Sequence, residues 1–485
     1  MGSYTTRLKI YKPAIGEKKW GPLVDANADI IDQAISALQD AATDMSAAEV
    51  LAAGSTTPRL LASRFGDVFN VKDFGALGNG AADDTAAIQA ACDQAAIQPV
   101  GTVYVPHGTY ITTAPLLVEN AFGVRIIGDS QIGSLISGSH TGKAILSLVG
   151  SRSIQLSNLC LTGSIAARPK TGLLLGRSSA GNAGYHSVRD LLINGSYAKT
   201  GLYIVASEEN EFSNVLVVTT DAPAAAAYIS YTDTLGVGGL TTSTMTQLTF
   251  TRCGFYQNDA TAGNTTLHIQ FDANTGNMTF TNLFLAKNGG DSFINFTLDA
   301  YGRNVTFNGV AGEAMGTLPT NGLRLQGTPG MHFSHFIAEP IGLQALTNAI
   351  KCDAGLGQFH DSRIHWTPTV DGQTMALNAA YGSELLFLNN GPITFDNGLY
   401  ASTLIHNSDP ADVTINISRA GSIIREFTNS HAGRVHMPIV ATGLLPAAGA
   451  VEDGSVLIED NGTGNRNLII YAGGQRFRLD GGATF

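Results

Sequence analysis

The sequence predicts an all-β protein whose main part is a parallel β-helix, a solenoid of stacked coils. Three observations predict it: a recurring phenylalanine, an Asn or Asp two residues after most of these phenylalanines, and a composition that suits strands and tight turns. Of the 485 residues, 14% are charged and 56 are glycine, whereas ordinary proteins have about 25% charged residues and about 7% glycine. The hydrophobic share of 44% indicates a packed core rather than a disordered chain.

The repeat is the strongest of the three observations. The recurring phenylalanines are Phe212, Phe250, Phe280, Phe307, Phe333, Phe359 and Phe387, at spacings of 38, 30, 27, 26, 26 and 28 residues, and Leu156 and Val188 extend the column upstream. The positions two residues later are Asn158, Asp190, Asn214, Arg252, Asn282, Gly309, His335, Asp361 and Asn389. Stacked coils bring equivalent positions within about 4.8 Å of each other, so inward rings can stack and turn amides can bind neighbouring backbone. A propeller would repeat every 40 to 50 residues or so, and a leucine-rich repeat would show its own consensus.

The first 58 residues differ from the repeat and predict an arm followed by a helical stem. Residues 4–24 are rich in Lys, Arg, Pro and Gly, and residues 54–58 (GSTTP) form a linker. Between them, apolar or small residues fall at Ile31, Ile35, Leu38, Ala42, Met45 and Ala52, with Glu49 interrupting. This 4-3 spacing is typical of a coiled-coil seam, and isoleucine at consecutive seam positions favours three strands. An amphipathic helix packed on the body is the alternative.

Residues 59–430 are predicted to form the β-helix, and its first coil carries a short helix. Asp83, Asp84 or Thr85 would cap this helix, which would bury Ile88, Ala91, Cys92 and Ala95. Residues 431–485 break the period and contain Asn-Gly and Gly-Gly turns between short apolar runs. They predict a small antiparallel C-terminal β module.

Charge and cysteine content limit the possible partners. The net charge of −11 argues against nucleic acid as the main partner. The four cysteines are 68, 93 and 99 residues apart, so neither a disulfide framework nor a paired-cysteine metal site is expected. The start, MGSYTTRLKIYKP, lacks the apolar core of a secretory signal, and no run of 18 apolar residues follows. We therefore expect no membrane insertion, no metal site and no cofactor.

Two stretches resemble known proteins. Residues 69–118 contain FNVKDFGA, DDTAAIQAA and GTVYVPHGTY, which in wording and order resemble the pectate-lyase-like right-handed β-helix family found in phage tailspikes and polysaccharide depolymerases. The usual Gly-Asp-Gly turn of that family is Gly78-Asn79-Gly80 here. The N-terminal LKIYKPAIGEKKWGPLVDANADIIDQAI is similar to virion-attachment segments of phage tail fibres and tailspikes.

The resemblance implies a function as well as a right-handed β-helix. Such proteins are homotrimers that bind, and often cleave, a bacterial surface polysaccharide such as a capsule, an O-antigen or an exopolysaccharide. The implied location is the virion, as a tail appendage made in the host cytoplasm. The N-terminal arm would attach it to the phage tail or baseplate.

One register contains candidate catalytic residues. The sixth residue beyond the column phenylalanine is Glu313, Glu339 and His365 in three successive coils, and Arg363 lies two residues before His365. Two carboxyl groups in neighbouring coils suit glycoside hydrolysis, in which one acts as acid and the other as base or nucleophile. The alternative is that both glutamates are solvated turn residues.

Other residues are candidates for substrate binding or for different chemistry. Tyr256 and Trp366 would serve as sugar platforms, and Asp272 and Asp299, 27 residues apart, form a second acidic column that can equally cap turns. A polysaccharide lyase would instead use His365 or Tyr256 as base, and Arg363 or Arg303 to neutralise a uronate. A spike that binds glycan without cleaving it is the remaining alternative.

Overall fold

In the computed structural model the chain divides into two compact units, Met1–Phe69 and Asn70–Phe485. The predicted domain boundaries at residues 58 and 430 stay predictions. The structure describes residues 3–4, 11–12, 21–43, 48–98, 100–221, 224–243, 245–259, 264–272, 275–299, 302–327, 332–343, 348–352, 358–360, 362–366, 374–381, 384–387, 393–400, 402–406, 415–417, 424–429, 439–441, 456–460, 466–472 and 475–479. No helix among these residues is both long enough and apolar enough to span a membrane.

The first unit consists of one long helix and short paired strands. Helix α1 (Gly21–Thr43) is accompanied by the antiparallel pairs β1 (Ser3–Tyr4) with β2 (Tyr11–Lys12) and β3 (Glu49–Val50) with β4 (Arg59–Leu60), and by α2 (Leu61–Phe65). The prediction that the coiled-coil seam continues to Ala52 is wrong, because Glu49 belongs to a strand. The predicted seam residue Met45 lies outside the described residues. The seam residues Ile31, Ile35 and Leu38 are on the helix and are 39%, 46% and 70% exposed.

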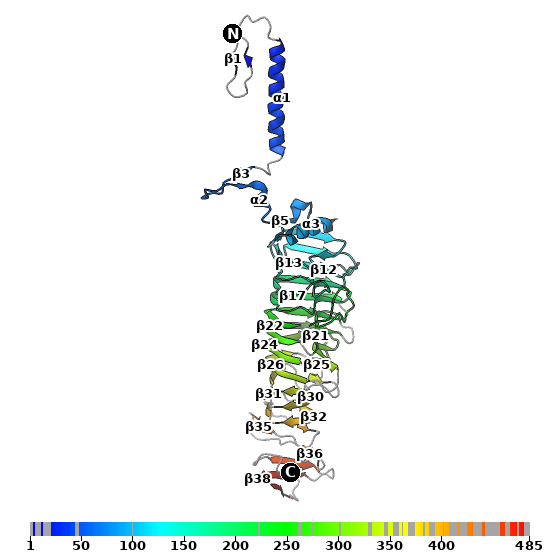
Figure 1. The fold of residues 1–485 in the computed structure, drawn as a ribbon. Helices are drawn as coiled ribbons and strands as arrows, with labels where there is room; N and C mark the ends of the chain where they lie inside the picture. Colours follow the sequence, from blue (N-terminus) through cyan, green and yellow to red (C-terminus); the bar gives the residue numbers. More distant parts are fainter. Residues whose placement is uncertain are drawn as a thin grey trace. The chain divides into compact units, whose positions relative to one another are not determined.

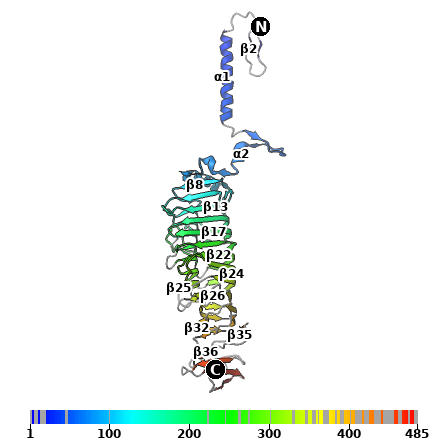
Figure 2. The ribbon, with the colours of Figure 1, turned by 180° about the vertical axis from the view of Figure 1, so that it is seen from behind.

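The second unit is the predicted right-handed parallel β-helix, in which each coil contributes to three faces (Figures 1 and 2). β7 (Thr102–Val105) and β10 (Arg125–Gly128) begin the first face, and β6 (Asn79–Asp83), β8 (Gly108–Thr112) and β11 (Ser134–Gly138) begin the second. The following strands cross from the first face to the second: β13 (Gln155–Gly163), β15 (Ser187–Ser196), β17 (Glu211–Asp221), β19 (Thr246–Thr251) with β20 (Gly254–Gln257), β22 (Gly276–Lys287), β24 (Gly302–Ala314) and β26 (His332–Leu343). The third face is formed by β9 (Leu116–Leu117), β12 (Ala144–Val149), β14 (Thr171–Gly176), β16 (Thr200–Val205), β18 (Ala225–Ser230), β21 (Thr265–Phe271), β23 (Ser292–Leu298), β25 (Asn321–Gly327) and β27 (Asn348–Cys352).

The Asn and Asp column marks the bend between the first and second faces. Asn158, Asp190, Asn214, Arg252 and Asn282 have φ between 49° and 57°, and Gly309 has φ 69°. Asn, Asp and Gly tolerate this left-handed conformation better than other residues. The column therefore has a backbone origin, and the Asn214 side chain adds a hydrogen bond of 2.6 Å to Asp190 in the coil before it.

The phenylalanine column stacks inside the first face, as predicted, over four coils. The rings of Phe212, Phe250, Phe280 and Phe307 are successively 4.5, 4.9 and 4.7 Å apart between centroids. The next member was assigned wrongly, because Phe307 pairs with Ala338 and not with Phe333. Phe333 pairs with Gly302 at the start of β24, and Phe336 fills the interior instead, with its ring 5.9 Å from that of Phe307.

A helix covers the first coils, as the sequence predicts. Strand β5 (Phe69–Asn70) and the 3-10 helix η1 (Val71–Phe74) precede α3 (Thr85–Ala96), which buries Ile88, Ala91, Cys92 and Ala95. The Asp83 carboxylate accepts the N–H of Thr85, at 3.0 Å. Asp84 points back to accept the N–H groups of Leu77 and Gly78, at 2.7 and 3.1 Å.

The later part of the unit continues as paired strands and ends antiparallel. Parallel pairing runs through β28 (Gln358–His360), β29 (Arg363–Trp366), β30 (Thr374–Tyr381), β31 (Glu384–Phe387), β32 (Ile393–Tyr400), β33 (Ser402–His406), β34 (Ile415–Ile417), β35 (Ile424–Asn429) and β36 (Ile439–Ala441). β37 (Val456–Asp460), β38 (Arg466–Ala472) and β39 (Gln475–Leu479) then pair antiparallel, as predicted for the C-terminal β module.

A buried histidine predicts how stability depends on pH. His186 is 1% exposed; its Nδ1 accepts the N–H of Ile154 at 3.3 Å, and its Nε2 has no partner among the described residues. Burial lowers the pKa of His186 to about 3, whereas in the unfolded chain it is about 6.5. Between these two pKa values only the unfolded chain binds the proton. The contribution of His186 to the free energy of unfolding is therefore fully present above about pH 6.5. It is lost as pH falls towards 3, by about 1.4 kcal/mol per pH unit.

Urea midpoints measured at pH 7, 6, 5 and 4 test this expectation. His186→Gln should unfold with a shallower loss of stability on acidification than the natural chain, because its side chain does not titrate. His107→Gln, which removes an exposed imidazole, is the control. Equal slopes for the natural chain and His186→Gln would contradict the assignment.

Candidate functional site

The predicted catalytic register holds up to Glu313 and then breaks. Val218, Tyr256, Ala286 and Glu313 are paired in successive coils, as the sequence predicts. Glu339, however, pairs with Asn308, which lies five residues before Glu313 and on the other side of the bend. The predicted juxtaposition of Glu313 and Glu339 is therefore wrong, because it followed the misassigned Phe333.

The residues predicted around His365 are placed only by their backbone. Ile337 pairs with Arg363 and Ala338 with Ile364, so Glu339 and His365 follow paired residues in adjacent strands, where the register shifts. Arg363 is exposed. The side chains of Glu339, His365 and Trp366 lie outside the described part of the chain, and the roles predicted for these residues stay predictions.

Tyr256 lies on the outer side of the second face, where it contacts an aromatic ring of the next coil. Its ring centroid is 5.8 Å from that of Phe284, and both side chains are half-buried. Tyr256 belongs to the second face, whereas the predicted Asp272 and Asp299 follow strands of the third face. Tyr256 is therefore not grouped with either aspartate.

The structure does bring Asp272 and Asp299 together. Phe271 pairs with Leu298, so the two aspartates follow equivalent ends of β21 and β23, and the Asp299 N–H donates to the Phe271 carbonyl at 3.0 Å. The Asp299 carboxylate accepts hydrogen bonds from the Tyr231 hydroxyl at 3.2 Å and the Gln270 amide at 2.5 Å. Burial raises the pKa of Tyr231, and the negative charges of Asp299 and Asp272 raise it further. Two carboxylates thus follow equivalent strand ends in adjacent coils, and one of them accepts the hydrogen bond of a phenol.

Asp272 also has the structural role that its sequence pattern indicates. Its carboxylate accepts the Thr275 hydroxyl at 2.5 Å, and the Thr275 N–H donates to the Asp272 carbonyl at 3.2 Å, which closes a turn. Asp272 is half-buried and Asp299 is exposed. The turn fixes one carboxylate beside the more accessible one.

A ladder of polar side chains runs along the outer side of the third face next to these aspartates. In successive coils Tyr228 pairs with His268, His268 with Asn295, Asn295 with Arg324 and Arg324 with Lys351. We call these five residues the polar ladder. Their neighbours in each strand, such as Leu267 and Ile269, are buried in the core, so the side chains alternate between core and outside as strand geometry requires.

His268 is held as a neutral ring within the ladder. Its ring stacks on Tyr228, with centroids 4.2 Å apart and planes 10° apart. The Asn295 amide lies 3.0 Å from Nδ1 and the Thr297 hydroxyl 3.2 Å from Nε2. Burial lowers the pKa of His268 to about 3. With both nitrogens partnered and the ring uncharged near neutral pH, His268 presents a rigid aromatic surface and is poorly suited to donate a proton.

Arg324 supplies the positive charge of the ladder, and Asp291 holds it in place. The guanidinium lies 2.7 Å from the Asp291 carboxylate, with both side chains largely buried. The Gln326 amide oxygen accepts from Arg324 at 3.0 Å, and its nitrogen donates to Asn295 Oδ1 at 3.2 Å. This network connects adjacent coils and fixes the direction in which its polar groups point.

One end of the ladder is bounded by a loop that folds over the third face. Residues 231–243, which we call the strap, place Leu235, Val237 and Leu240 against Leu174, Tyr203 and Val205. The Asp233 carboxylate accepts N–H groups of Val237 and Gly238 at 3.0 and 2.7 Å, and Lys170 donates to the Gly236 carbonyl at 3.1 Å. Tyr231, the first strap residue, is the one that binds Asp299, so the strap reaches the aspartate pair.

Comparison with known proteins identifies one segment that resembles a family. Residues 68–158 match the family described as rhamnogalacturonase A/epimerase, pectate lyase-like. The chain is 42% identical over 81 residues to mannuronan C5-epimerase AlgE4 of Azotobacter vinelandii, which is 17% of this chain and 14% of that protein. A probable glucan endo-1,3-beta-glucosidase of Arthroderma benhamiae is 41% identical over 71 residues, 13% of this chain and 8% of that protein. The chain therefore spans a small part of these relatives.

Two solved structures match the chain at low sequence identity. The Agl-KA catalytic domain matches with a TM-score of 0.50 and 12% identity, over 80% of this chain and 68% of that one. The gp42 tailspike of Acinetobacter phage vb_AbaP_AS12 matches with a TM-score of 0.42 and 12% identity, over 86% and 66%. The first of these supports the β-helix fold.

Sequence reasoning missed the polar ladder of the β-helix, although a signal for it exists. The segments TLHIQF, FINFTL and GLRLQG place His268, Asn295 and Arg324 between apolar residues, 27 and 29 residues apart. This period-2 pattern at the coil spacing predicts an outward column. In the earlier AAAYIS the strap covers the outer side, so the alternation is lost.

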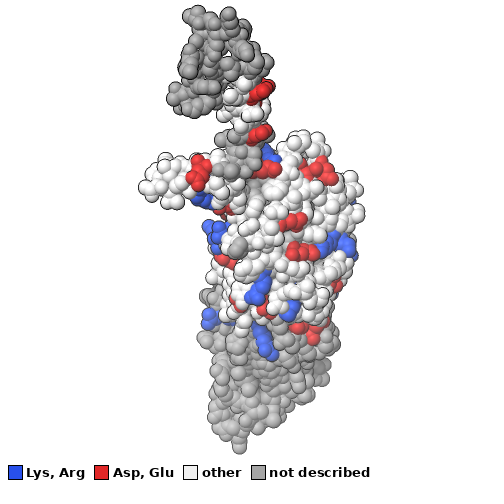
Figure 3. Space-filling model, turned by 45° about the horizontal axis from the view of Figure 1, so that its top comes forward, with Lys and Arg blue, Asp and Glu red and all other residues white. Residues whose placement is uncertain are grey.

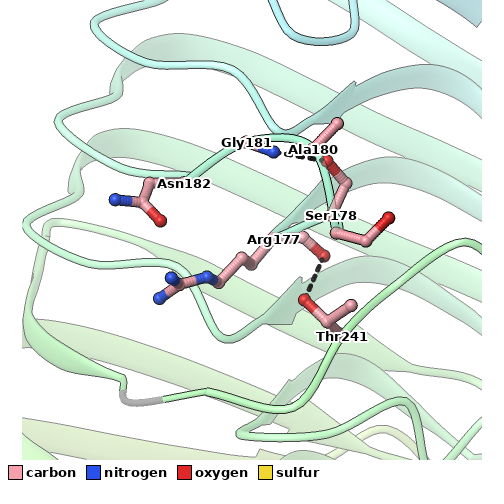
Figure 4. Close-up of a pocket in the computed structure, with 7 residues that line it drawn as sticks. Arg177, Ser178, Ala180, Gly181, Asn182 and Thr241 are labelled. Atoms are coloured by element: carbon pink, nitrogen blue, oxygen red, sulfur yellow. Dashed lines mark hydrogen bonds between the residues drawn. The ribbon is translucent and has the colours of Figure 1, made fainter.

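A separate hollow opens beside the strap on the corner after β14. Its volume is about 440 Å³, and Arg177, Ser178, Ser179, Ala180, Gly181, Asn182 and Thr241 line it (Figure 4). The Gly181 N–H donates to the Ser178 hydroxyl at 3.0 Å, and the Thr241 N–H donates to the Arg177 carbonyl at 3.0 Å. None of these seven described residues carries a carboxylate, so they suit the binding of polar groups better than acid–base chemistry.

Proposed function

We propose that the protein is a phage tailspike that binds a bacterial surface polysaccharide along its third face and cleaves it by glycosidic hydrolysis. One observation carries the proposal: Asp272 and Asp299 follow paired ends of strands in adjacent coils, next to the polar ladder, and Asp299 accepts the Tyr231 hydroxyl. Glycosidases use two carboxyl groups, one to protonate the leaving oxygen and one to act as base or nucleophile. The proposed catalytic carboxylates are therefore Asp272 and Asp299 on the third face, in place of the predicted Glu313 and Glu339.

The ladder would bind the chain that the aspartates cut. The half-buried ring of His268, stacked on the buried Tyr228 and held by the buried Asn295, offers an aromatic surface, while the half-buried Arg324 and Lys351 offer donors in adjacent coils. Because coils are about 4.8 Å apart, an extended glycan lying along the solenoid would meet one donor after another. On the face that Figure 3 shows, charged side chains are scattered over the described part of the surface.

Location in the virion and assembly are part of the same proposal. The similarity of the N-terminal segment to virion-attachment segments supports a place on the phage tail or baseplate. The exposed Ile31, Ile35 and Leu38 of α1 follow 4-3 spacing, and burying such a stripe against copies of itself favours a homotrimer.

Incubation with polysaccharide tests the function. Purified protein is expected to be retained by at least one of a panel of bacterial capsular, O-antigen and exopolysaccharide preparations, and to release new reducing ends from it. Products that absorb in the ultraviolet as unsaturated uronates would show that the cleavage is a lyase reaction and not hydrolysis. Retention without any new ends would leave a non-catalytic adhesion spike, and no retention on any preparation would reject the proposal.

A further inference from the structure

Tyr185 occupies a backbone conformation that a tyrosine rarely adopts. It lies at the corner between the third and first faces, where equivalent positions in other coils are Ser153, Glu209, Asn277 and Asn304, all with positive φ. Tyr185 has φ 58° and its side chain is 45% exposed. A bulky residue in this region costs conformational energy, and such strain gathers at functional sites. Core packing does not account for Tyr185, because nearly half of the side chain is in solvent.

The exposed ring of Tyr185 holds an arginine from the coil before it. The guanidinium carbon of Arg152 lies 4.8 Å from the centroid of the Tyr185 ring, a cation–π contact. Arg152 has no side-chain hydrogen bond or ion pair with any residue that the structure describes. Its N–H donors are therefore oriented by the ring and still available.

A second aromatic residue completes the feature. Phe122 forms an isolated parallel bridge with Arg152, which places the two residues in neighbouring coils, and Phe122 is 62% exposed. Phe122, Arg152 and Tyr185, which we call the corner strip, thus alternate as aromatic, cation and aromatic along the solenoid. The loop that carries Tyr185 also carries the lining of the polar hollow, residues 177–182.

We infer that the corner strip is a second glycan-binding site, separate from the aspartate pair and the polar ladder. A pyranose ring stacks its C–H face on Phe122, because aromatic faces are electron-rich and attract the polarised hydrogens of a sugar. Arg152 donates hydrogen bonds to the hydroxyl or carboxylate groups of the same sugar. Tyr185 is a positioning residue that orients Arg152. The inference rests on the proposed polysaccharide binding and extends it to this corner.

The inference is tested by measuring affinity for glycans. The probes are sodium alginate, xanthan, dextran and the bacterial capsular, O-antigen and exopolysaccharide preparations. The measurements use Asp299→Asn protein, so that bound chains are not cut. Phe122→Ala and Arg152→Gln are each expected to weaken binding by about threefold to tenfold. Ile132→Ala, which truncates another exposed apolar side chain (81% exposed), is the matched control and should leave affinity unchanged.

Tyr185→Gly separates a functional role from a structural one. Glycine adopts positive φ without strain, so this variant should unfold at the same or higher denaturant concentration and yet bind glycan more weakly. Tyr185→Phe keeps the ring and should bind like the parent.

Unchanged affinity in Phe122→Ala, Arg152→Gln and Tyr185→Gly, with the parent still binding, would overturn the inference and leave the proposed function standing. A parent that binds no glycan would reject both. A change of oligomeric state in Phe122→Ala would make the strip a protein interface and overturn the inference.

Discussion

Replacing Phe280 by alanine is expected to lower the free energy of unfolding by about 3–5 kcal/mol. Phe280 is fully buried, and its ring is stacked between those of Phe250 and Phe307, at 4.9 and 4.7 Å. The substitution removes both stacking contacts and leaves a cavity in the middle of a column that cannot collapse, because strands on either side fix the coil spacing. The expected effect is therefore at the upper end for a buried aromatic residue.

Hydrogen exchange measured coil by coil tests this expectation. Since each coil of a solenoid contacts only its neighbours, exchange should accelerate in β19, β22 and β24 far more than in β13 or β15. Thr279→Ala, an outward neighbour in the same strand, should change stability by less than about 0.5 kcal/mol. Phe280→Leu should recover part of the loss. Uniform acceleration over all coils, or a loss equal to that of Thr279→Ala, would show that the column does not hold the coils together.

The part of the fold that sequence could predict is the part in which one residue type marks each coil. Phe212 to Phe307 and the bend residues from Asn158 to Gly309 are such markers, because an interior ring and a left-handed bend each restrict the choice of residue. Once they are aligned, the register of Val218, Tyr256, Ala286 and Glu313 follows.

The break at Phe333 was beyond sequence reasoning for a physical reason. Both Phe333 and Phe336 lie in β26, and the 26-residue spacing made Phe333 the natural choice. The paired residue is Ala338, 31 residues after Phe307, because the connections between these strands are longer than in the coil before. The length of a surface connection is weakly constrained by energy, so the spacing of phenylalanines alone cannot show which ring points inward.

The candidate site was found only in part for a similar reason. Asp272 and Asp299 are recognisable as a stacked column, yet Tyr231, which binds Asp299, is 41 residues before Asp272 and begins the strap. The fold-back of the strap depends on tertiary contacts such as those of Asp233 and Lys170. No local pattern in the sequence encodes them.

Exchange of Asp299 for asparagine is expected to reduce polysaccharide cleavage at least about 100-fold, because a positioned acid or base contributes that much or more. Asparagine has nearly the shape of aspartate and keeps an oxygen that can accept the Tyr231 hydroxyl, so folding and glycan retention should persist. Asp272→Asn should reduce cleavage to a similar extent. The double variant should be little worse than either single one, since the two carboxyl groups act on one bond.

Release of reducing ends from the polysaccharide that retains the natural protein measures this effect. Asp221→Asn is the matched control, because it removes another partly exposed carboxylate, one that lies 3.2 Å from Arg168 at the end of β17. Tyr231→Phe removes the hydroxyl that orients Asp299 and should change the pH profile of cleavage while melting at an unchanged temperature. If both aspartate variants cleave as fast as Asp221→Asn, the third face does not hold the catalytic pair. In that case the exposed Glu313 of the second face becomes the next carboxylate to replace, because it alone of the two predicted glutamates keeps the predicted register.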